Sequence, residues 1–338
     1  MDYLFSQLQQ LIAIPSPSGF TAEVAGYVME ELRSLGFDPV LTRKGCVVCC
    51  LGGEGRPLVY AAHIDTLGAV VAEVKANGQL RLSPIGGLAA PNIETENCRI
   101  FTRSGKTYTG TMQLIDPSLH VNPDFKTKER NYSTMQVVLD AKTASKAETR
   151  ALGIGVGDLV AFDPRYTVTD TGYIKSRFLD DKLSVAILLD YAKAVREKRA
   201  SLGRRVYLFI SVYEEVGHGA ASGLPQDAEE IVSVDMGCVG EGLSCTEHQV
   251  SICVKDSRGP YNRAVTAALM DCADRCGIDY EADVYPMYGS DADAALQAGW
   301  ELRHGLIGAG VYASHGYERT HTDGVKQTAA LVRAYAEQ

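Results

Sequence analysis

The sequence has no apolar run long enough to cross a membrane and no excess of positive charge. Its apolar stretches fall well short of the ~18 residues that indicate a membrane-spanning helix. Lysine and arginine number 33 against 42 aspartate and glutamate residues, so the formal net charge is −9. This balance argues against a general nucleic-acid or anionic-membrane binder. We therefore expect neither a nucleic-acid nor a membrane partner.

Signals for export and for thiol-based metal sites are also missing. The first 20 residues lack the basic segment and the small-residue cleavage site of a signal peptide. The nine cysteines are scattered, and the densest group, Cys46, Cys49 and Cys50, has no second ligand pair at zinc-knuckle spacing. We interpret this group as a half-buried strand with reduced thiols. Reduced thiols indicate a cytoplasmic protein.

The chain changes character twice. Residues 1–68 and 165–338 alternate helical patterns with short apolar strands, whereas residues 69–164 show short alternating segments rich in Thr and Gly. The first pattern predicts an α/β domain with a mostly parallel sheet covered by helices. The second predicts an inserted all-β domain of barrel or sandwich type. Predicted helices cover about 2–14, 21–35, 182–198, 264–276 and 325 to the end.

Acidic residues and histidines follow several predicted strands, where α/β sheets collect reactive groups. They are His63 and Asp65, Glu214 and Glu215, Asp235, and His315, with Asp180 and Asp181 just ahead of an apolar helix. Each alone has an ordinary structural explanation, such as a helix cap. Together they offer nitrogen and oxygen ligands without thiolates, which suits Zn²⁺, Co²⁺ or Mn²⁺. The set is large enough for one ion or for two that share a carboxylate.

Six motifs make the sequence similar to the M42 family of metallo-aminopeptidases, which includes tetrahedral dodecameric and glutamyl aminopeptidases. They are AAHIDTLG (61–68), SRFLDDKLS (176–184), YEEVGHGA (213–220), VDMGCVGEG (234–242), KDSRGPYNRAV (255–265) and GSDADA (289–294). They occur in the family's order and cover nearly the whole chain. The resemblance implies a zinc-peptidase-like catalytic domain (1–68 plus 165–338) with a PDZ-like β-domain (69–164) inserted into it.

The resemblance also implies two divalent ions per subunit, Zn²⁺ or Co²⁺, with Mn²⁺ as a third candidate. His63 and Asp235 would hold one ion, and Glu215 and a late histidine the other. Asp180 would bridge the two ions. The family's last motif is Tyr-x-His-Ser followed by Glu, whereas this chain reads YASHGYERTHTDGV. His315 is the favoured ligand there, and His321 remains the alternative.

Two further roles follow from the resemblance. Glu214 would be the general base, and Asp65 would accept the ring N–H of His63 and fix its tautomer. Thr66 stands where the family usually has Glu. That Glu is not a metal ligand in the family, so this difference affects the surroundings of the site and not the ligand set. His218 is interpreted as a structural or outer residue.

The function implied is removal of N-terminal residues from peptides with a free N-terminus, by a homo-oligomer that could be a tetrahedral dodecamer. Three alternatives remain open. A related dinuclear deacylase or carboxypeptidase would use the same ions. A glycoside hydrolase would explain the paired carboxylates but leaves His63, Asp180 and Asp235 without a role. A non-catalytic scaffold could bind peptides through the β-insert.

Overall fold

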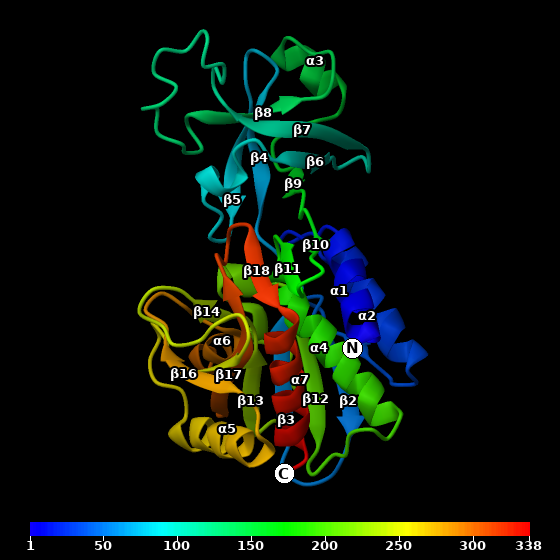
Figure 1. Ribbon diagram of the computed structural model, residues 1–338. Coiled ribbons are helices and arrows are strands. Elements are labelled where there is room, and N and C mark those ends of the chain that lie inside the picture. Colours follow the sequence, from blue (N-terminus) through cyan, green and yellow to red (C-terminus); the bar gives the residue numbers. More distant parts are fainter. The chain divides into compact units, whose positions relative to one another are not determined.

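The computed structural model describes residues 1–338, which divide into two compact units (Figure 1). The sheet unit comprises Met1–Asp65 and Arg165–Gln338, and the barrel unit comprises Thr66–Pro164. The first boundary thus falls after Asp65 rather than after Gly68, the position expected from composition. No helix combines the length and the apolar character that crossing a bilayer requires.

Helices of the sheet unit form where apolar residues recur at helical spacing. They are α1 (Asp2–Ala13), α2 (Ala22–Ser34), α4 (Leu179–Arg196), α5 (Arg263–Cys276), α6 (Asp291–Gln297) and α7 (Thr322–Ala336). In α1 the buried residues Leu4, Leu8 and Leu11 recur at this spacing and fix the inward face. The five helices predicted from periodicity are confirmed. The sequence of α6 resembles a turn, because this helix is short and directly follows Gly-Ser.

Twelve strands of the sheet unit form one mixed sheet. They are β1 (Val40–Leu41), β2 (Val47–Gly52), β3 (Leu58–His63), β10 (Thr167–Val168), β11 (Tyr173–Ser176), β12 (Val206–Ser211), β13 (Glu230–Val234), β14 (Gly237–Val239), β15 (Val250–Lys255), β16 (Tyr280–Val284), β17 (Arg303–Tyr312) and β18 (Glu318–His321). The main order is β1-β2-β12-β3-β13-β17-β18-β11-β10, with β14 and β15 also pairing with β17, and β16 with β15.

The expectation of a mostly parallel sheet is wrong, although the centre of the sheet is parallel. The four central strands, β12, β3, β13 and β17, lie side by side in that order and run parallel to one another. On both sides antiparallel strands continue the sheet, including β2 against β12 and β18 against β17. Local patterning identifies strands but does not show which way a partner runs, so the antiparallel margins were not predicted.

Helices cover both faces of this sheet. All residues of β3 are buried, so the strand is enclosed on both sides. The hydroxyl of Tyr60 donates to the carbonyl of Val332 in α7 at 2.7 Å, which places α7 on the Tyr60 face. Ala61 points the other way and pairs with Ser233, whose hydroxyl accepts the N–H of Ala292 in α6 at 3.0 Å. Helix α6 therefore lies on the opposite face.

The barrel unit is a closed antiparallel barrel in the order β4-β5-β8-β7-β6-β9. Its elements are β4 (Gly68–Val74), β5 (Leu80–Ile85), β6 (Asn97–Phe101), β7 (Thr107–Leu114), β8 (Met135–Leu139), β9 (Leu159–Phe162), the 3₁₀-helix η1 (Ala90–Ile93) and α3 (Lys146–Ala151). This confirms the predicted β-barrel. The narrower likeness to a PDZ domain stays a prediction.

Candidate metal and catalytic site

The parallel centre of the sheet brings the ends of its strands to one place. Strand β3 ends at His63, and Ser211 at the end of β12 lies directly beside it in the ladder. Two residues separate β12 from the 3₁₀-helix η2 (Glu214–Val216), which is followed by η3 (Gly219–Ala221). Asp235 directly follows β13. The candidate side chains thus meet because parallel strands carry their carboxyl ends to the same edge.

His63 is the centre of this cluster and is almost fully buried. Its Nδ1 lies 2.9 Å from the backbone carbonyl oxygen of Asp65, which can only accept, so Nδ1 must donate. The lone pair of Nε2 then faces Oδ1 of Asp180 at 3.0 Å. Two acceptors at this distance repel each other unless a cation or a proton lies between them. The ring is therefore held in the tautomer that a metal ligand requires.

Asp180 lies between two histidines. Its Oδ2 is 3.5 Å from Nε2 of His315, so its two oxygens face different rings. The Asp180–Asp181 peptide bond is cis. The carboxylate of Asp181 accepts the backbone N–H of His63 at 3.2 Å. The backbone N–H of Asp180 donates to Glu318 at 3.1 Å. Glu318 also accepts the backbone N–H of His315 at 3.1 Å, so one buried carboxylate positions both residues.

The two adjacent glutamates are held by Asp65. Its carboxylate accepts the backbone N–H groups of Glu214 at 3.1 Å and Glu215 at 3.4 Å, together with the hydroxyl of Ser18 at 2.5 Å. The ring N–H of His63 goes to the backbone carbonyl of Asp65, while the nearer carboxylate oxygen lies 3.6 Å from Nδ1. The carboxylate therefore braces the turn, a role different from the one that the resemblance implies.

The remaining candidate ligands complete the ring of oxygen and nitrogen atoms. Oδ2 of Asp235 lies 3.9 Å from Nε2 of His63, and its other oxygen accepts the N–H of Met236 at 2.6 Å. Nε2 of His315 lies 3.6 Å from Oε2 of Glu215. The side chain of His315 is 39% exposed, so this candidate ligand lies on the open side of the site.

Negative charge dominates the cluster. Burial raises the pKa of Asp235 to about 7, and the charge of Asp180 acts in the same direction. Burial also raises the pKa values of Glu214 and Glu215 well above their ordinary range. Burial would lower the pKa of His63, but its hydrogen bond with Asp180 and the charges of nearby carboxylates raise it strongly. A divalent cation would compensate the charge of carboxylates this crowded.

The donor set fits a metal ion. Oε1 of Glu215 and Oδ1 of Asp181 are buried and have no hydrogen-bond partner. Buried carboxylate oxygens are costly without a partner, and a cation would supply one. Ligand atoms of His63, Asp180 and Glu215 lie within 4.8 Å of one another, as do those of His63, Asp181 and Asp235. Imidazole nitrogen and carboxylate oxygen are the donors that Zn²⁺ and its neighbours accept.

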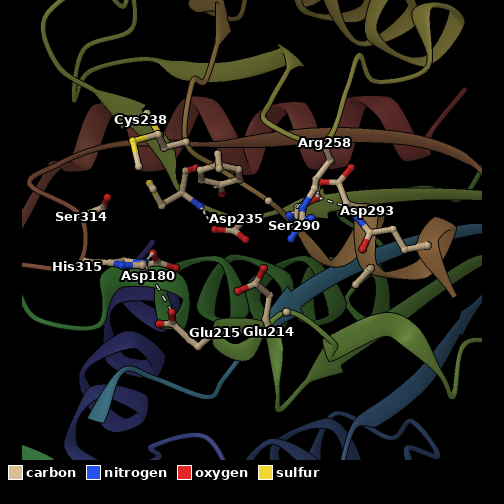
Figure 2. A pocket seen from close by; sticks show the side chains of 17 residues that line it. Asp180, Glu214, Glu215, Asp235, Cys238, Arg258, Ser290, Asp293, Ser314 and His315 are labelled. Carbon is tan, nitrogen blue, oxygen red and sulfur yellow. Dashed lines mark hydrogen bonds and ion pairs between the residues drawn. The ribbon is translucent and has the colours of Figure 1, made fainter. Parts of the chain in front are cut away.

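A pocket of about 380 Å³ opens beside these side chains (Figure 2). Asp180, Glu214, Glu215, Asp235 and His315 line one part of it. Figure 2 shows Arg258 at the side away from His315, close to Ser290 and Asp293. Arg258 is the only lysine or arginine in the lining, and its guanidinium makes no hydrogen bond or ion pair. The pocket therefore has one side crowded with carboxylates and another where Arg258 and Asp293 lie close together.

Two predicted histidines lie outside the cluster. His321 caps the amino end of α7, where its Nδ1 accepts the N–H of Asp323 at 3.1 Å. His218 is exposed and stacks on Tyr213 with ring centroids 5.0 Å apart. Of the two candidates for the last ligand, only His315 lies beside Asp180 and Glu215.

Asp291 supports the site from α6, a role that its place in the GSDADA motif does not reveal. Its carboxylate accepts the hydroxyl of Ser211 at 2.6 Å and the N–H of Ala220 at 2.7 Å. A Cβ atom on Gly219 would lie 2.0 Å from this carboxylate, so only glycine fits there. Asp291 thus ties the end of β12 to η3, and the glutamates lie between these two points.

Comparison with known proteins shows which family this chain belongs to. The family described as M42 glutamyl aminopeptidase matches residues 45–331. The YhfE protein of Bacillus subtilis (strain 168) is 43% identical over 332 residues, which cover 98% of this chain and 96% of that protein. The lysyl aminopeptidase of Pyrococcus furiosus is 24% identical over 211 residues, covering 62% of this chain and 59% of that protein.

A solved structure shows the same fold. The TET1 peptidase of Pyrococcus horikoshii superposes with a TM-score of 0.86 at 22% identity, covering 98% of this chain and 99% of that one. With the family match over most of the sequence, this likeness accounts for both the mixed sheet and the inserted barrel. The chain belongs to the M42 family of aminopeptidases and is a hydrolase of peptide bonds.

Proposed function

We propose that this chain is an aminopeptidase that depends on two divalent metal ions held in the sheet unit. The observation that carries the proposal is the position of Asp180, whose two oxygens face His63 and His315. His63 and Asp235 would hold one ion, and His315 and Glu215 the other. Asp180 would be shared. When bound, such ions lower the pKa of a water molecule and polarise the carbonyl of the scissile bond.

Glu214 is the residue that we assign to proton transfer. It lines the pocket, and its carboxylate lies 3.8 Å from Nε2 of His63, farther than that of Asp180. The carboxylate of Asp65 holds the backbone of Glu214. The side chain of Glu214 then faces the pocket and is not needed as a metal ligand. As general base it would take a proton from the attacking water at a carboxylate oxygen. It would then deliver that proton to the leaving amine.

We further propose that the pocket prefers peptides with an acidic N-terminal residue. The carboxylates beside the ions would attract the free α-amino group. Arg258 would then face the side chain of that residue with a guanidinium that has no partner within the chain. A charged hydrogen bond of this kind contributes roughly 1.5–3 kcal/mol. The names of relatives include both glutamyl and lysyl aminopeptidases, so the preference is argued from Arg258 alone.

Assembly and compartment are part of the same proposal. The TET1 peptidase is described as assembling into a tetrahedron or a large octahedral shell. We propose that this chain forms a homo-oligomer, with a tetrahedral dodecamer as the specific expectation. All nine cysteines are unpaired, which fits the reducing cytoplasm. Light scattering tests the assembly, since a particle near the subunit mass of 36.5 kDa would contradict it.

The deciding experiment is hydrolysis of a panel of aminoacyl-nitroanilides after reconstitution with Zn²⁺, Co²⁺ or Mn²⁺. We expect cleavage only with metal, only with a free amino group, and fastest for glutamyl and aspartyl substrates. Hydrolysis of blocked substrates would point to a deacylase. Activity on glycosides that survives EDTA would point to a glycoside hydrolase, and no activity with any metal would favour a scaffold.

A further inference from the structure

A second histidine cluster lies apart from the site described above. It consists of His248, in the connection between β14 and β15, His321 at the end of β18, and Asp323 in the first turn of α7. One ligand atom from each lies within 4.8 Å of the other two. None of the three lines the catalytic pocket. Because two imidazoles and a carboxylate meet there, the cluster has the composition of a metal site.

Hydrogen bonds fix which nitrogen of His321 carries the proton. Nε2 lies 2.9 Å from the carbonyl oxygen of Thr171, so Nε2 must donate. Nδ1 then has the lone pair, and it lies 3.3 Å from Oδ2 of Asp323. Unlike Nε2 of His63, this atom already accepts the N–H of Asp323 at 3.1 Å, and a cation would take the place of that hydrogen bond. The carboxylate of Asp323 is close enough to share that cation with Nδ1.

His248 is oriented in the same way. Its Nδ1 faces Oδ2 of Asp323 at 4.0 Å, while its Nε2 lies 3.5 Å from the hydroxyl of Tyr173. Both rings thus turn Nδ1 toward the carboxylate and Nε2 toward an outer hydrogen-bond partner. Outer partners of this kind set the tautomer and the direction of histidine ligands in metal sites. The ring centroids are 4.4 Å apart, so the rings lie next to each other.

The geometry points to a site for one divalent transition-metal ion of the Zn²⁺ class, held by Nδ1 of His248, Nδ1 of His321 and a carboxylate oxygen of Asp323. A tetrahedral Zn²⁺ ion keeps its ligand atoms about 3.4 Å apart. The contact between His321 and Asp323 already has this length, and His248 needs a small shift. Two imidazoles exclude Mg²⁺ and Ca²⁺, which take oxygen ligands.

Two features indicate an ion that exchanges with solvent. The side chains of His248 and Asp323 are 43% and 52% exposed, so water can complete the coordination. Binding at Nδ1 of His321 also displaces the N–H of Asp323, which this atom accepts at 3.1 Å as the cap of α7. The carboxylate of Asp323 offsets the positive end of that helix. The bound ion would link the loop before β15 to the start of α7.

Metal content measured after equilibrium dialysis tests the site on the full-length, metal-loaded protein. His248→Gln and Asp323→Asn each remove one ligand, and Asp323→Asn keeps the backbone N–H that α7 needs. His120→Gln changes an exposed histidine of the barrel unit and serves as the matched control. With Zn²⁺ as the probe, each ligand variant should bind one ion fewer per chain than wild type and the control. Hydrolytic activity should be the same in all four proteins.

Cobalt provides a second readout that does not depend on counting ions. The difference spectrum of wild type minus His248→Gln, both loaded with Co²⁺, should contain the visible band of a nitrogen- and oxygen-ligated ion. The spectrum of His120→Gln should match that of wild type. The proposal is overturned if either ligand variant holds as many ions as wild type, or if the cobalt difference spectrum is flat.

Discussion

The carboxylate of Asp65 accepts the backbone N–H of Glu214 at 3.1 Å, although the two residues are 149 positions apart in the chain. The same carboxylate also accepts the N–H of Glu215 and the hydroxyl of Ser18. Asp65 therefore sets the course of the turn from which both glutamates project. This makes it a positioning residue whose effect should be visible in turnover.

Replacing Asp65 with Asn should lower kcat by about 10- to 100-fold, the usual range for residues that orient metal-site ligands. One amide group cannot accept all three hydrogen bonds, because its NH₂ only donates. Steady-state kinetics with metal analysis provides the measurement. Ser18→Ala removes one of the three bonds and should have a smaller effect. Unchanged kcat in Asp65→Asn would contradict the bracing role.

Glu214→Gln should reduce kcat by at least about 10²- to 10⁴-fold, because an amide cannot take the proton of the attacking water. Metal content should stay at the wild-type level, since Glu214 is not assigned as a ligand. Glu215→Gln is the matched control and should lose metal as well as activity. If Glu214→Gln turned over at a normal rate, the assignment of the base would be wrong.

Asp180→Asn should weaken the binding of both ions at once, because the two oxygens of this residue face different histidines. We expect the affinity for each ion to fall by more than about 100-fold, beyond the range seen for outer residues. Titration of the metal-free protein with Zn²⁺, followed by calorimetry, measures both binding events. Two ions still bound tightly would exclude a shared carboxylate.

Arg258→Ala should lower kcat/KM for glutamyl-nitroanilide by roughly 10- to 100-fold, the equivalent of a lost charged hydrogen bond. Cleavage of leucyl-nitroanilide should change little, and Arg258→Glu should improve the lysyl substrate relative to the glutamyl one. Arg263→Ala, at an exposed arginine outside the pocket lining, is the control. A uniform loss on all substrates would indicate a structural role for Arg258.

Asp293 should make stability depend on pH. Burial raises the pKa of its carboxyl to about 7, and a hydrogen bond with Asp256 acts in the same direction. An unfolded Asp loses its proton near pH ~3.9, so between about pH 4 and about pH 7 the native state binds more protons than the unfolded state. Stability attributable to this group is therefore full below that window and is lost as pH rises through it.

Thermal unfolding across this window should show a smaller fall in Tm for Asp293→Asn than for wild type, because asparagine does not titrate. Asp170→Asn, at an exposed aspartate, should follow the wild-type curve. Parallel curves for Asp293→Asn and wild type would show that this carboxyl does not carry the effect.

Features encoded in local patterns could be predicted from the sequence. The apolar run before Glu214 forms β12, and the periodic segments form helices close to the expected bounds. The polar residues Thr320 and His321 come just before the last predicted helix, and His321 indeed caps α7. These features depend on neighbours a few residues away, so spacing and side-chain type are enough to predict them.

Features that depend on distant partners could not be predicted. Nothing near Glu318 shows that its carboxylate will meet the N–H of Asp180, and nothing near Asp291 points to Ser211. Spacing also does not distinguish the carbonyl of Asp65 from its carboxylate as the acceptor for His63. The antiparallel strands at the margins of the sheet could not be predicted either, because strand pairing depends on the whole chain.

The place of the barrel unit in the sequence affects when the sheet can form during synthesis. Strand β3 leaves the ribosome before the barrel unit, whereas its two parallel neighbours, β12 and β13, emerge after it. The barrel strands are contiguous in the chain and can pair as soon as they appear. The sheet must wait for its later strands, and His315 follows β17, the parallel neighbour of β13. With His315 as the proposed last ligand, the two-metal site cannot be complete before synthesis has passed that residue.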